Sequence, residues 1–389
     1  METGIIESFF IIFVGAAALA TFALYTRQPL IVAYIAVGCL LGPNALALVA
    51  DPALLAEVGE IGIIFLLYLV GLDLPPNKLK DLFRKSVLTA LGSSAAFFAV
   101  GFGVLYAFGF TLAEACIAGV AAMFSSTILG IKLLPTTVLH HRHIGELVIS
   151  LLLIQDVIAI LALLVLAALS TADSGSALGI AIQVAVALPA VAVVAAVGVR
   201  FLIVPVIARF DAFHEFIFLL AVGWCLGIAS LGHLVGLSFE IGAIVAGVSL
   251  ANSPIAQYIT ESLRPLRDFF LVLFFFSVGA AIDPVLLAKM AVPTLMLAVV
   301  LVAIKPPVFR ALLRWQGEPS GASTEAGFRL GQASEFSLLL TYVAGAALLS
   351  AEAAHVIQGA TVVTLLVSTY LVIFRYPSPI AVSERLRRN

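Results

Sequence analysis

Long apolar stretches recur along the whole chain, and they decide what it can fold into. Each is about 20 residues long, the length that a helix needs to cross a hydrocarbon core of roughly 30 Å. Of the 389 residues, 62% are hydrophobic and only 11% are charged, so a water-soluble fold would lack polar surface. A transmembrane barrel would show a weaker, alternating pattern. We therefore expect an all-α integral membrane protein.

The apolar stretches and the basic residues together predict a topology. Thirteen spans are expected, centred near residues 15, 38, 65, 98, 122, 158, 192, 224, 244, 275, 300, 337 and 364. All of the 20 Lys and Arg residues except Lys289 and Lys305 fall in the loops after odd-numbered spans, Arg329 among them, or in the C-terminal tail. Basic loops stay in the cytoplasm. The pattern predicts a multi-pass protein of the cell inner (plasma) membrane, with its N-terminus outside and its C-terminus in the cytoplasm.

Charge, cysteine and histidine content exclude several other functions. The net charge of -2 gives no reason to expect a nucleic-acid partner. The three cysteines lie in apolar stretches and are expected to be small buried hydrophobes. His140, His141 and His143 form a loop cluster for which we expect solvation, with metal binding as the alternative; a solvated cluster of this kind can also sense pH. We expect no cofactor in this chain, and no metal beyond a transported ion.

Two pairs of similar segments indicate an internal repeat. Residues Tyr34–Asn44 resemble Ala243–Ser253 at an offset of 209. Residues Leu66–Asp73 resemble Phe274–Asp283 at offsets of 208 to 210. The offset covers seven spans, an odd number, so the two halves must have opposite orientations. This predicts an inverted-repeat transporter, with its site near the midplane between discontinuous helices.

Asp156 lies in the middle of an apolar stretch, directly after Gln155. A carboxylate near the centre of a membrane helix opposes insertion by roughly 2.5 to 3.5 kcal/mol, and such residues mark ion paths, proton relays or buried pairs. We favour a functional acid, because one carboxylate can hold one proton or one monovalent cation but not both. The alternative is a static pair with a basic residue that holds two helices together.

Polar residues interrupt two further spans, and the repeat offset relates the interruptions to each other. They are Ser125, Ser126 and Thr127 in the fifth span, and Gly331, Gln332, Ser334 and Glu335 in the twelfth. Two broken helices that meet would leave free carbonyls and helix ends to bind a cation. The alternative is that the hydroxyls bond to the preceding turn of an unbroken helix.

Two further charged residues are candidates for charge compensation at this place. Lys305 lies in the eleventh span, just before Pro306 and Pro307, and its side chain is expected to lean toward Asp156. A static bridge is an equal alternative for Lys305. Glu335 would lie beside helix ends, where compensation of the helix dipole is favoured over a role as a second cation ligand.

At these residues the chain resembles the monovalent cation:proton antiporter-2 family, and most of all its potassium-efflux (Kef) branch. The matching motifs run from about residue 30 to residue 340, and include Val37–Pro43, Glu57–Gly62, Phe124–Thr127, Gln155-Asp156, Gly236–Ala243, Phe275–Gly279 and Gly331–Phe336. Gln155-Asp156 is the most specific of them.

The resemblance implies a sodium/proton-antiporter-like fold of thirteen helices. It implies a core domain with crossed broken helices in spans 5 and 12, a separate dimerisation domain that gives a homodimer, and elevator-type alternating access. Both subdomains would be interleaved within residues 1–376. Asp156 would bind the cation and carry the proton, with Ser126 and Thr127 beside it. A Gln-Asp pair implies potassium/proton exchange, and the single acid independently favours an electroneutral one-for-one stoichiometry.

The C-terminal end departs from the longer Kef proteins. Residues 377–389 read as a basic cytoplasmic tail, and no Gly-rich dinucleotide fingerprint follows a strand in this chain. A nucleotide-binding regulatory domain would then belong to a longer protein or to a separate subunit, or regulation would be lacking.

Four functions are candidates for this chain: K⁺/H⁺ antiport, Na⁺/H⁺ antiport of the same fold, a cation channel and an intramembrane enzyme. The chain lacks the Thr-Val-Gly-Tyr-Gly loop of a potassium filter. It also lacks a His-Glu-x-x-His motif, since His214-Glu215 is followed by Phe216-Ile-Phe218. We expect a secondary active transporter and no enzyme.

Overall fold

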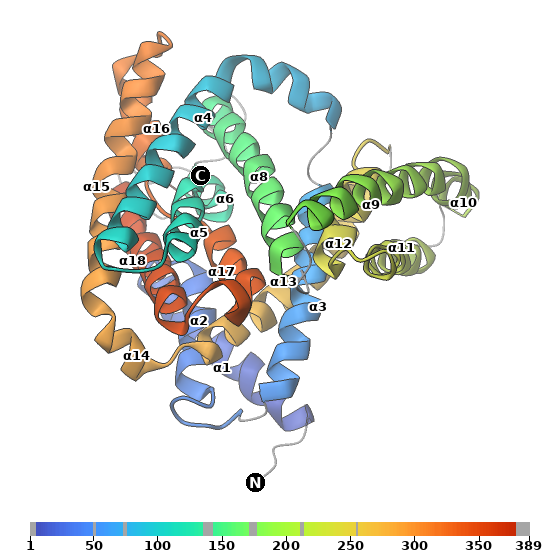
Figure 1. The fold of residues 1–389 in the computed structure, drawn as a ribbon, viewed down its shortest axis with the longest axis horizontal. Helices are drawn as coiled ribbons and strands as arrows, with labels where there is room; N and C mark the ends of the chain where they lie inside the picture. Colours follow the sequence, from blue (N-terminus) through green and yellow to red (C-terminus); the bar gives the residue numbers. More distant parts are fainter. Residues whose placement is uncertain are drawn as a thin grey trace. The chain divides into compact units, whose positions relative to one another are not determined.

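The structure is a computed structural model that describes residues 5–49, 52–72, 76–134, 143–170, 177–210, 214–253 and 256–378. Helices are the only regular elements in these ranges, as Figure 1 shows. Seven of the helices described are long and apolar enough to cross a membrane: Ile6–Tyr25, Ser86–Ala107, Ile144–Ala167, Val186–Arg209, Glu215–Leu234, Ala291–Trp315 and Ala351–Arg375. The prediction of an all-α membrane protein is confirmed. The count of thirteen spans stays a prediction.

The chain divides into two compact units that alternate along the sequence. The first comprises Met1–Ala50, Asp81–Ala159 and Val278–Asn389, and the second comprises Asp51–Lys80 and Ile160–Ser277. Three helices, α4 (Pro76–Ala107), α8 (His143–Ser170) and α13 (Ala256–Ala281), contribute residues to both. The division of residues 1–376 into core and dimerisation subdomains stays a prediction.

The first unit contains most of the helices. They are α1 (Ile5–Tyr25), α2 (Leu30–Leu41), most of α4 (Pro76–Ala107), α5 (Leu112–Met123), α6 (Thr127–Lys132), α14 (Pro284–Lys289), α15 (Ala291–Trp315), α16 (Ser320–Arg329), α17 (Glu335–Leu348) and α18 (Ala351–Arg375). The helices α5, α6 and α17 begin after the hydroxyl residues Thr111, Ser126 and Ser334, whose oxygens accept bonds from free N–H groups of the first turn.

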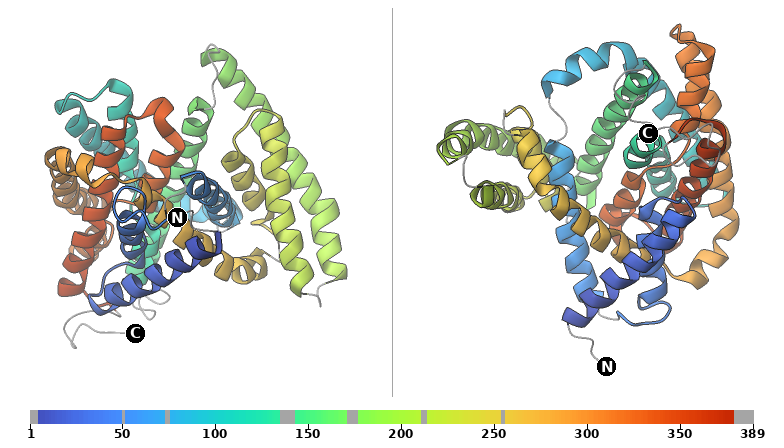
Figure 2. Two further views of the ribbon diagram at one scale, coloured as in Figure 1. Left: turned by 90° about the horizontal axis from the view of Figure 1, so that it is seen from below. Right: turned by 180° about the vertical axis from the view of Figure 1, so that it is seen from behind.

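The second unit contains α3 (Pro52–Leu72), α9 (Ala177–Gly198), a π-helical turn (Val199–Ile203), α10 (Val204–Arg209), α11 (His214–Leu234) and α12 (Phe239–Leu250). The long helices α9 and α11 lie side by side, as the left view of Figure 2 shows. Helix α12 packs closely on α3. A Cβ atom built on Gly71 would lie 2.7 Å from the carbonyl oxygen of Ile244, so glycine lets the two backbones touch.

A corresponding contact occurs in the first unit, between α2 and the end of α13. A Cβ atom on Gly279 would collide with the carbonyl oxygen of Ile35. Ile35 and Ile244 are 209 residues apart, and Gly71 and Gly279 are 208 apart. The contact of α2 with α13 and the contact of α12 with α3 therefore correspond to each other. They use matching positions of the internal repeat.

Candidate functional site

The first interruption separates α5 from α6. Helix α5 ends at Met123, Phe124–Ser126 are not helical, and α6 begins at Thr127. Phe124 is extended, with φ of -91° and ψ of 152°. The Ser126 hydroxyl accepts a bond from the Leu129 backbone N–H at 3.1 Å and so caps the new helix. A serine inside an apolar stretch thus restarts the helix after a break.

The second interruption separates α16 from α17. Helix α16 ends at Arg329, residues 330–334 are not helical, and α17 begins at Glu335. Here the Ser334 hydroxyl accepts a bond from the Phe336 backbone N–H at 3.2 Å. Both restarted helices are capped by a serine, at positions 208 apart. That the broken helices cross stays a prediction.

The two interruptions are joined directly by hydrogen bonds. The Ser125 hydroxyl donates to the carbonyl oxygen of Leu330 at 2.7 Å. The Gln332 amide donates to the carbonyl oxygen of Ser126 at 3.4 Å. Both serines and Gln332 are fully buried. Residues some 205 positions apart in sequence therefore form one polar cluster inside an apolar unit.

Lys305 of α15 connects the two interruptions a second time. Its ammonium donates to the carbonyl oxygen of Phe124 at 2.6 Å and to that of Gln332 at 3.0 Å. It also lies over the Phe97 ring, 5.0 Å from the centroid, and is fully buried. Each break leaves a carbonyl without its helical partner, and Lys305 supplies a charged donor to both. That the positive charge of Lys305 compensates the negative charge of Asp156 stays a prediction.

Gln155 of α8 contacts the backbone of the first interruption. Its side-chain oxygen accepts from the Ser125 N–H at 3.2 Å, and its amide group donates to the carbonyl oxygen of Met123 at 3.4 Å. These bonds replace helical bonds that the break removes. The structure thus brings Gln155 to the break, and its role as an ion ligand stays a prediction.

Asp156 is the acid of the cluster. The Thr127 hydroxyl donates to its two carboxylate oxygens at 3.0 and 3.1 Å. Asp156 is 8% exposed, whereas Gln155, Ser125 and Ser126 are 0% exposed. Of these four side chains it is the one that keeps some exposed surface. Carboxylate and hydroxyl oxygens are hard donors, which suit small unpolarisable cations and protons.

The remaining predicted site residues lie at the second interruption. Glu335 is buried in the first turn of α17, where a carboxylate stabilises the helix dipole. Gly331 lies against α15, since a Cβ atom there would be 3.2 Å from Cγ of Pro306. The structure therefore places Glu335 and Gly331 at the second interruption, and their roles stay predictions.

Helix α18 supplies polar contacts that the sequence reasoning missed. The Ser368 hydroxyl donates to the side-chain oxygen of Gln332 at 3.0 Å, and the Thr364 hydroxyl accepts from the Ala333 N–H at 3.0 Å. Thr361, Thr364 and Ser368 recur every three to four residues, so they share one helix face. This spacing of hydroxyl residues within an apolar helix is the sequence signal from which the polar contacts of α18 could have been predicted.

Arg329 is a correction to the sequence analysis, which counted it among the basic loop residues; that it lies on the cytoplasmic side stays a prediction. Arg329 is the last residue of α16, and its side chain is 0% exposed. The guanidinium donates to the Leu133 carbonyl at 2.7 Å, to the Pro377 carbonyl at 2.8 Å and to Glu325 at 2.6 Å. A count of basic residues does not distinguish a solvated arginine from one whose donors are all bound inside the fold.

The loop histidines cannot be compared with the structure, because His140 and His141 lie outside the described residues, as does the tail beyond residue 378. Among the residues that the structure describes, no three His, Cys, Asp or Glu side chains come together to hold a metal ion.

The chain matches a known family of membrane proteins over almost its whole length. A family described as sodium/hydrogen exchanger, transmembrane, matches residues 9–374. The chain belongs to this family of membrane transporters. The predicted resemblance to Kef-type cation/proton antiporters is also confirmed by relatives of that name.

Individual relatives cover most of this chain. The glutathione-regulated potassium-efflux system protein KefC of Klebsiella pneumoniae subsp. pneumoniae is 31% identical over 339 residues, which are 85% of this chain but 54% of KefC. The chain thus spans about half of that relative. The iron transporter MagA of Paramagnetospirillum magneticum is 27% identical over 363 residues, 92% of this chain and 83% of MagA.

The fold is also similar to a solved structure. The sodium proton antiporter MjNhaP1 from Methanocaldococcus jannaschii, at pH 8, matches with a TM-score of 0.69 at 16% identity, over 94% of both chains. At this identity the match supports the antiporter-like fold.

Proposed function

We propose that this chain exchanges K⁺ for H⁺, one for one and without net charge movement. The observation that carries the proposal is the Asp156 carboxylate, which lies inside an apolar unit and accepts a hydrogen bond from the Thr127 hydroxyl at the start of the restarted helix α6. A carboxylate in a low-dielectric setting must be neutralised before it moves, and either a proton or a monovalent cation does this. Competition for one carboxylate is the basis of exchange.

Potassium is proposed over sodium on two grounds. Two relatives are potassium-efflux proteins by name. In this chain Gln155 stands where a second acid would add a second charge, and its amide is bonded to the backbone of the break. One titrating group per cycle gives an electroneutral stoichiometry. Sodium/proton exchange is the alternative of the same class.

Iron, the substrate in the name of MagA, is less well supported. Ferrous ion favours imidazole and several carboxylates, and no such group of three occurs in the described part of the chain. We further propose an elevator-type movement, a homodimer, the outward N-terminus and the inward C-terminus, and regulation by a nucleotide-binding domain or subunit.

The proposal is tested with purified protein in liposomes that contain a pH-sensitive dye. Addition of K⁺, Na⁺, Rb⁺ or Li⁺ is expected to move protons, with K⁺ the most effective, and Asp156→Asn is expected to abolish the movement. An imposed membrane voltage is expected to leave the rate unchanged.

Transport is separated from folding by requiring that Asp156→Asn elute and melt like the unmodified protein. Normal exchange in Asp156→Asn would contradict the central assignment. A strong dependence on voltage would contradict electroneutrality, and a larger response to Na⁺ than to K⁺ would assign the alternative cation.

A further inference from the structure

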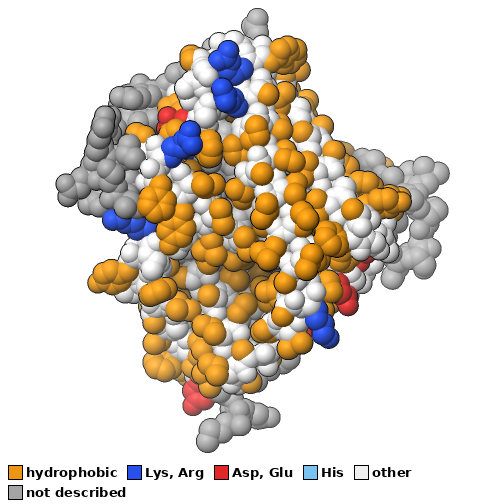
Figure 3. Space-filling view, turned by 90° about the vertical axis from the view of Figure 1, so that its left-hand side faces the viewer, with side chains coloured by type: hydrophobic (Ala, Val, Ile, Leu, Met, Phe, Trp, Pro, Cys, Tyr) orange, Lys and Arg blue, Asp and Glu red, His pale blue; other side chains and the backbone are white. Residues whose placement is uncertain are grey.

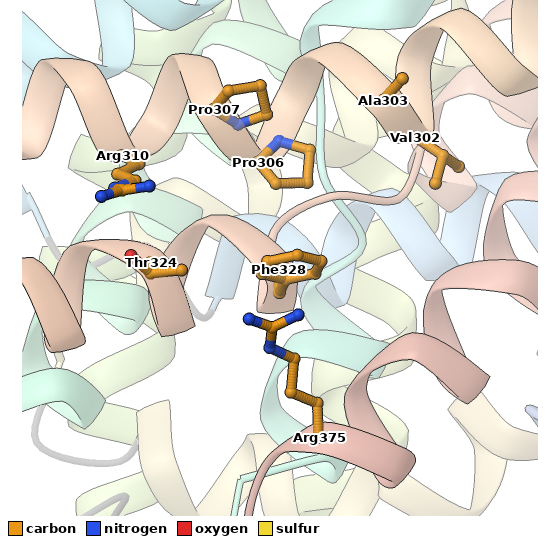
Figure 4. A pocket seen from close by; sticks show the side chains of 8 residues that line it. All are labelled: Val302, Ala303, Pro306, Pro307, Arg310, Thr324, Phe328 and Arg375. Atoms are coloured by element: carbon orange, nitrogen blue, oxygen red, sulfur yellow. The ribbon is translucent and has the colours of Figure 1, made fainter.

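A pocket lies between α15, α16 and the end of α18, and Asp156 is not among the residues that line it. Its volume is about 420 Å³, and Figure 4 shows the side chains that line it. One wall is α15 around Pro306 and Pro307, and the opposite side holds Thr324 and Phe328 of α16. The helices are in close contact beside it, because a Cβ atom on Gly327 would lie 2.5 Å from the Pro306 carbonyl oxygen. The pocket is therefore a feature of tightly packed helices.

Two arginines reach this pocket from different helices. Arg310 comes from α15 and Arg375 from the last turn of α18, and both are exposed. The Arg375 guanidinium lies over the Phe328 ring, 5.0 Å from its centroid, which holds it at the pocket. The eight described lining residues include no acid, and the nearby Glu325 carboxylate is already bonded to Arg329. The pocket thus presents positive charge to a ligand.

Apart from Thr324 and the two arginines, the residues that line the pocket are apolar. Val302, Ala303 and the two prolines continue its wall toward the middle of α15, which is a candidate membrane span. Trp315, 74% exposed, ends that helix five residues beyond Arg310, and exposed tryptophans mark the headgroup level. Figure 3, which looks onto the side where α15 lies in Figure 1, shows hydrophobic side chains over most of the face and Lys and Arg at its margins.

We infer that this pocket binds an anionic phospholipid of the surrounding membrane. The phosphate of the headgroup would bond to Arg310 and Arg375, whose planar guanidinium groups match phosphate oxygens. The first part of an acyl chain would lie along Val302 and Ala303. A ligand with one anionic and one apolar end matches this lining, whereas a free phosphate would leave the apolar wall uncovered. Basic pockets between membrane helices bind acidic lipids in this manner.

The test uses tryptophan fluorescence, because the chain has only two tryptophans. With Trp224→Phe as background, Trp315 reports from the helix that carries Arg310. The protein is reconstituted in phosphatidylcholine vesicles with a tenth of the lipid replaced by brominated phosphatidylglycerol or by brominated phosphatidylcholine. We expect quenching by phosphatidylglycerol to correspond to about tenfold enrichment at Trp315, with loss of the enrichment in Arg310→Gln/Arg375→Gln.

Two variants serve as controls. Arg314→Gln removes an exposed arginine of the same helix that does not line the pocket, and it should keep the enrichment. Arg310→Lys/Arg375→Lys keeps the positive charge and should keep part of the lipid enrichment. This result would show that loss of enrichment in the glutamine variant is not caused by misfolding. Equal quenching by the two lipids, enrichment that survives the double glutamine variant, or complete competition by millimolar inorganic phosphate or glycerol phosphate would each overturn the lipid site. Cation exchange is not the readout, so this test is independent of the proposed transport.

Discussion

At the scale of single residues, Asp156 and Gln155 show how neighbours in sequence take different tasks. Successive side chains on a helix point about 100° apart. Gln155 is fully buried and bonds the backbone of the first break, while Asp156 keeps 8% of its surface exposed. An amide can donate and accept at once, which a broken backbone requires. A carboxylate can only accept, unless it takes up a proton, and so it suits the titrating position.

The Thr127 hydroxyl is the second residue whose contribution can be measured. We predict that Thr127→Val lowers the apparent affinity for the cation by about tenfold, because a bond to a charged group contributes about 1.5 kcal/mol or more. The cation concentration that gives half-maximal proton movement in liposomes is the measurement. Thr127→Ser keeps the hydroxyl and should behave like the unmodified protein. An unchanged affinity in Thr127→Val would show that the hydroxyl does not act on the carboxylate.

At the scale of helices, two glycine contacts repeat across the halves of the chain. Gly71 lets α3 touch α12 at Ile244, and Gly279 lets α13 touch α2 at Ile35. We predict that Gly71→Ala and Gly279→Ala each lower stability by about 1 to 3 kcal/mol, as overpacking does in close-packed interiors. The measurement is the thermal melting midpoint of the purified protein in detergent.

Glycines in open positions provide the matched controls for these variants. A Cβ atom on Gly103 in α4 or on Gly223 in α11 would meet nothing within 4 Å. Gly103→Ala and Gly223→Ala should melt at or above the midpoint of the unmodified protein, because alanine favours a helix over glycine by about 0.5 to 1 kcal/mol. If Gly71→Ala and Gly279→Ala melted like these controls, the helices would not be packed backbone to backbone.

At the scale of the whole chain, Arg329 joins segments that are far apart in sequence. It bonds the carbonyl oxygens of Leu133 after α6 and Pro377 after α18, and it pairs with Glu325 in its own helix. We predict that Arg329→Gln lowers the unfolding free energy by about 3 kcal/mol, since two carbonyls lose a charged donor inside the fold. Thermal melting in detergent measures this, with Arg314→Gln as the exposed control. Equal melting of the two variants would count against a structural role for Arg329.

The membrane class and the position of the candidate acid follow from the sequence alone. Apolar stretches of about 20 residues leave a helical membrane fold as the solution, because every backbone polar group must find its partner inside the lipid. The free-energy cost of inserting a carboxylate within such a stretch distinguishes Asp156 from the other acids. The two interruptions are also visible in sequence, because serine is a helix-capping residue in both.

The tertiary structure alone decided which groups complete the interruptions. Lys305 is bonded to the carbonyls of Phe124 and Gln332, and Arg329 lies inside the fold and not in a loop. Neither arrangement follows from local sequence, since the partners lie far apart along the chain and a free carbonyl exists only after a helix has broken. Hydropathy and charge counts record whether a side chain by itself prefers water or an apolar environment. The carbonyl groups that stabilise a buried lysine or arginine are brought to it only when the helices pack.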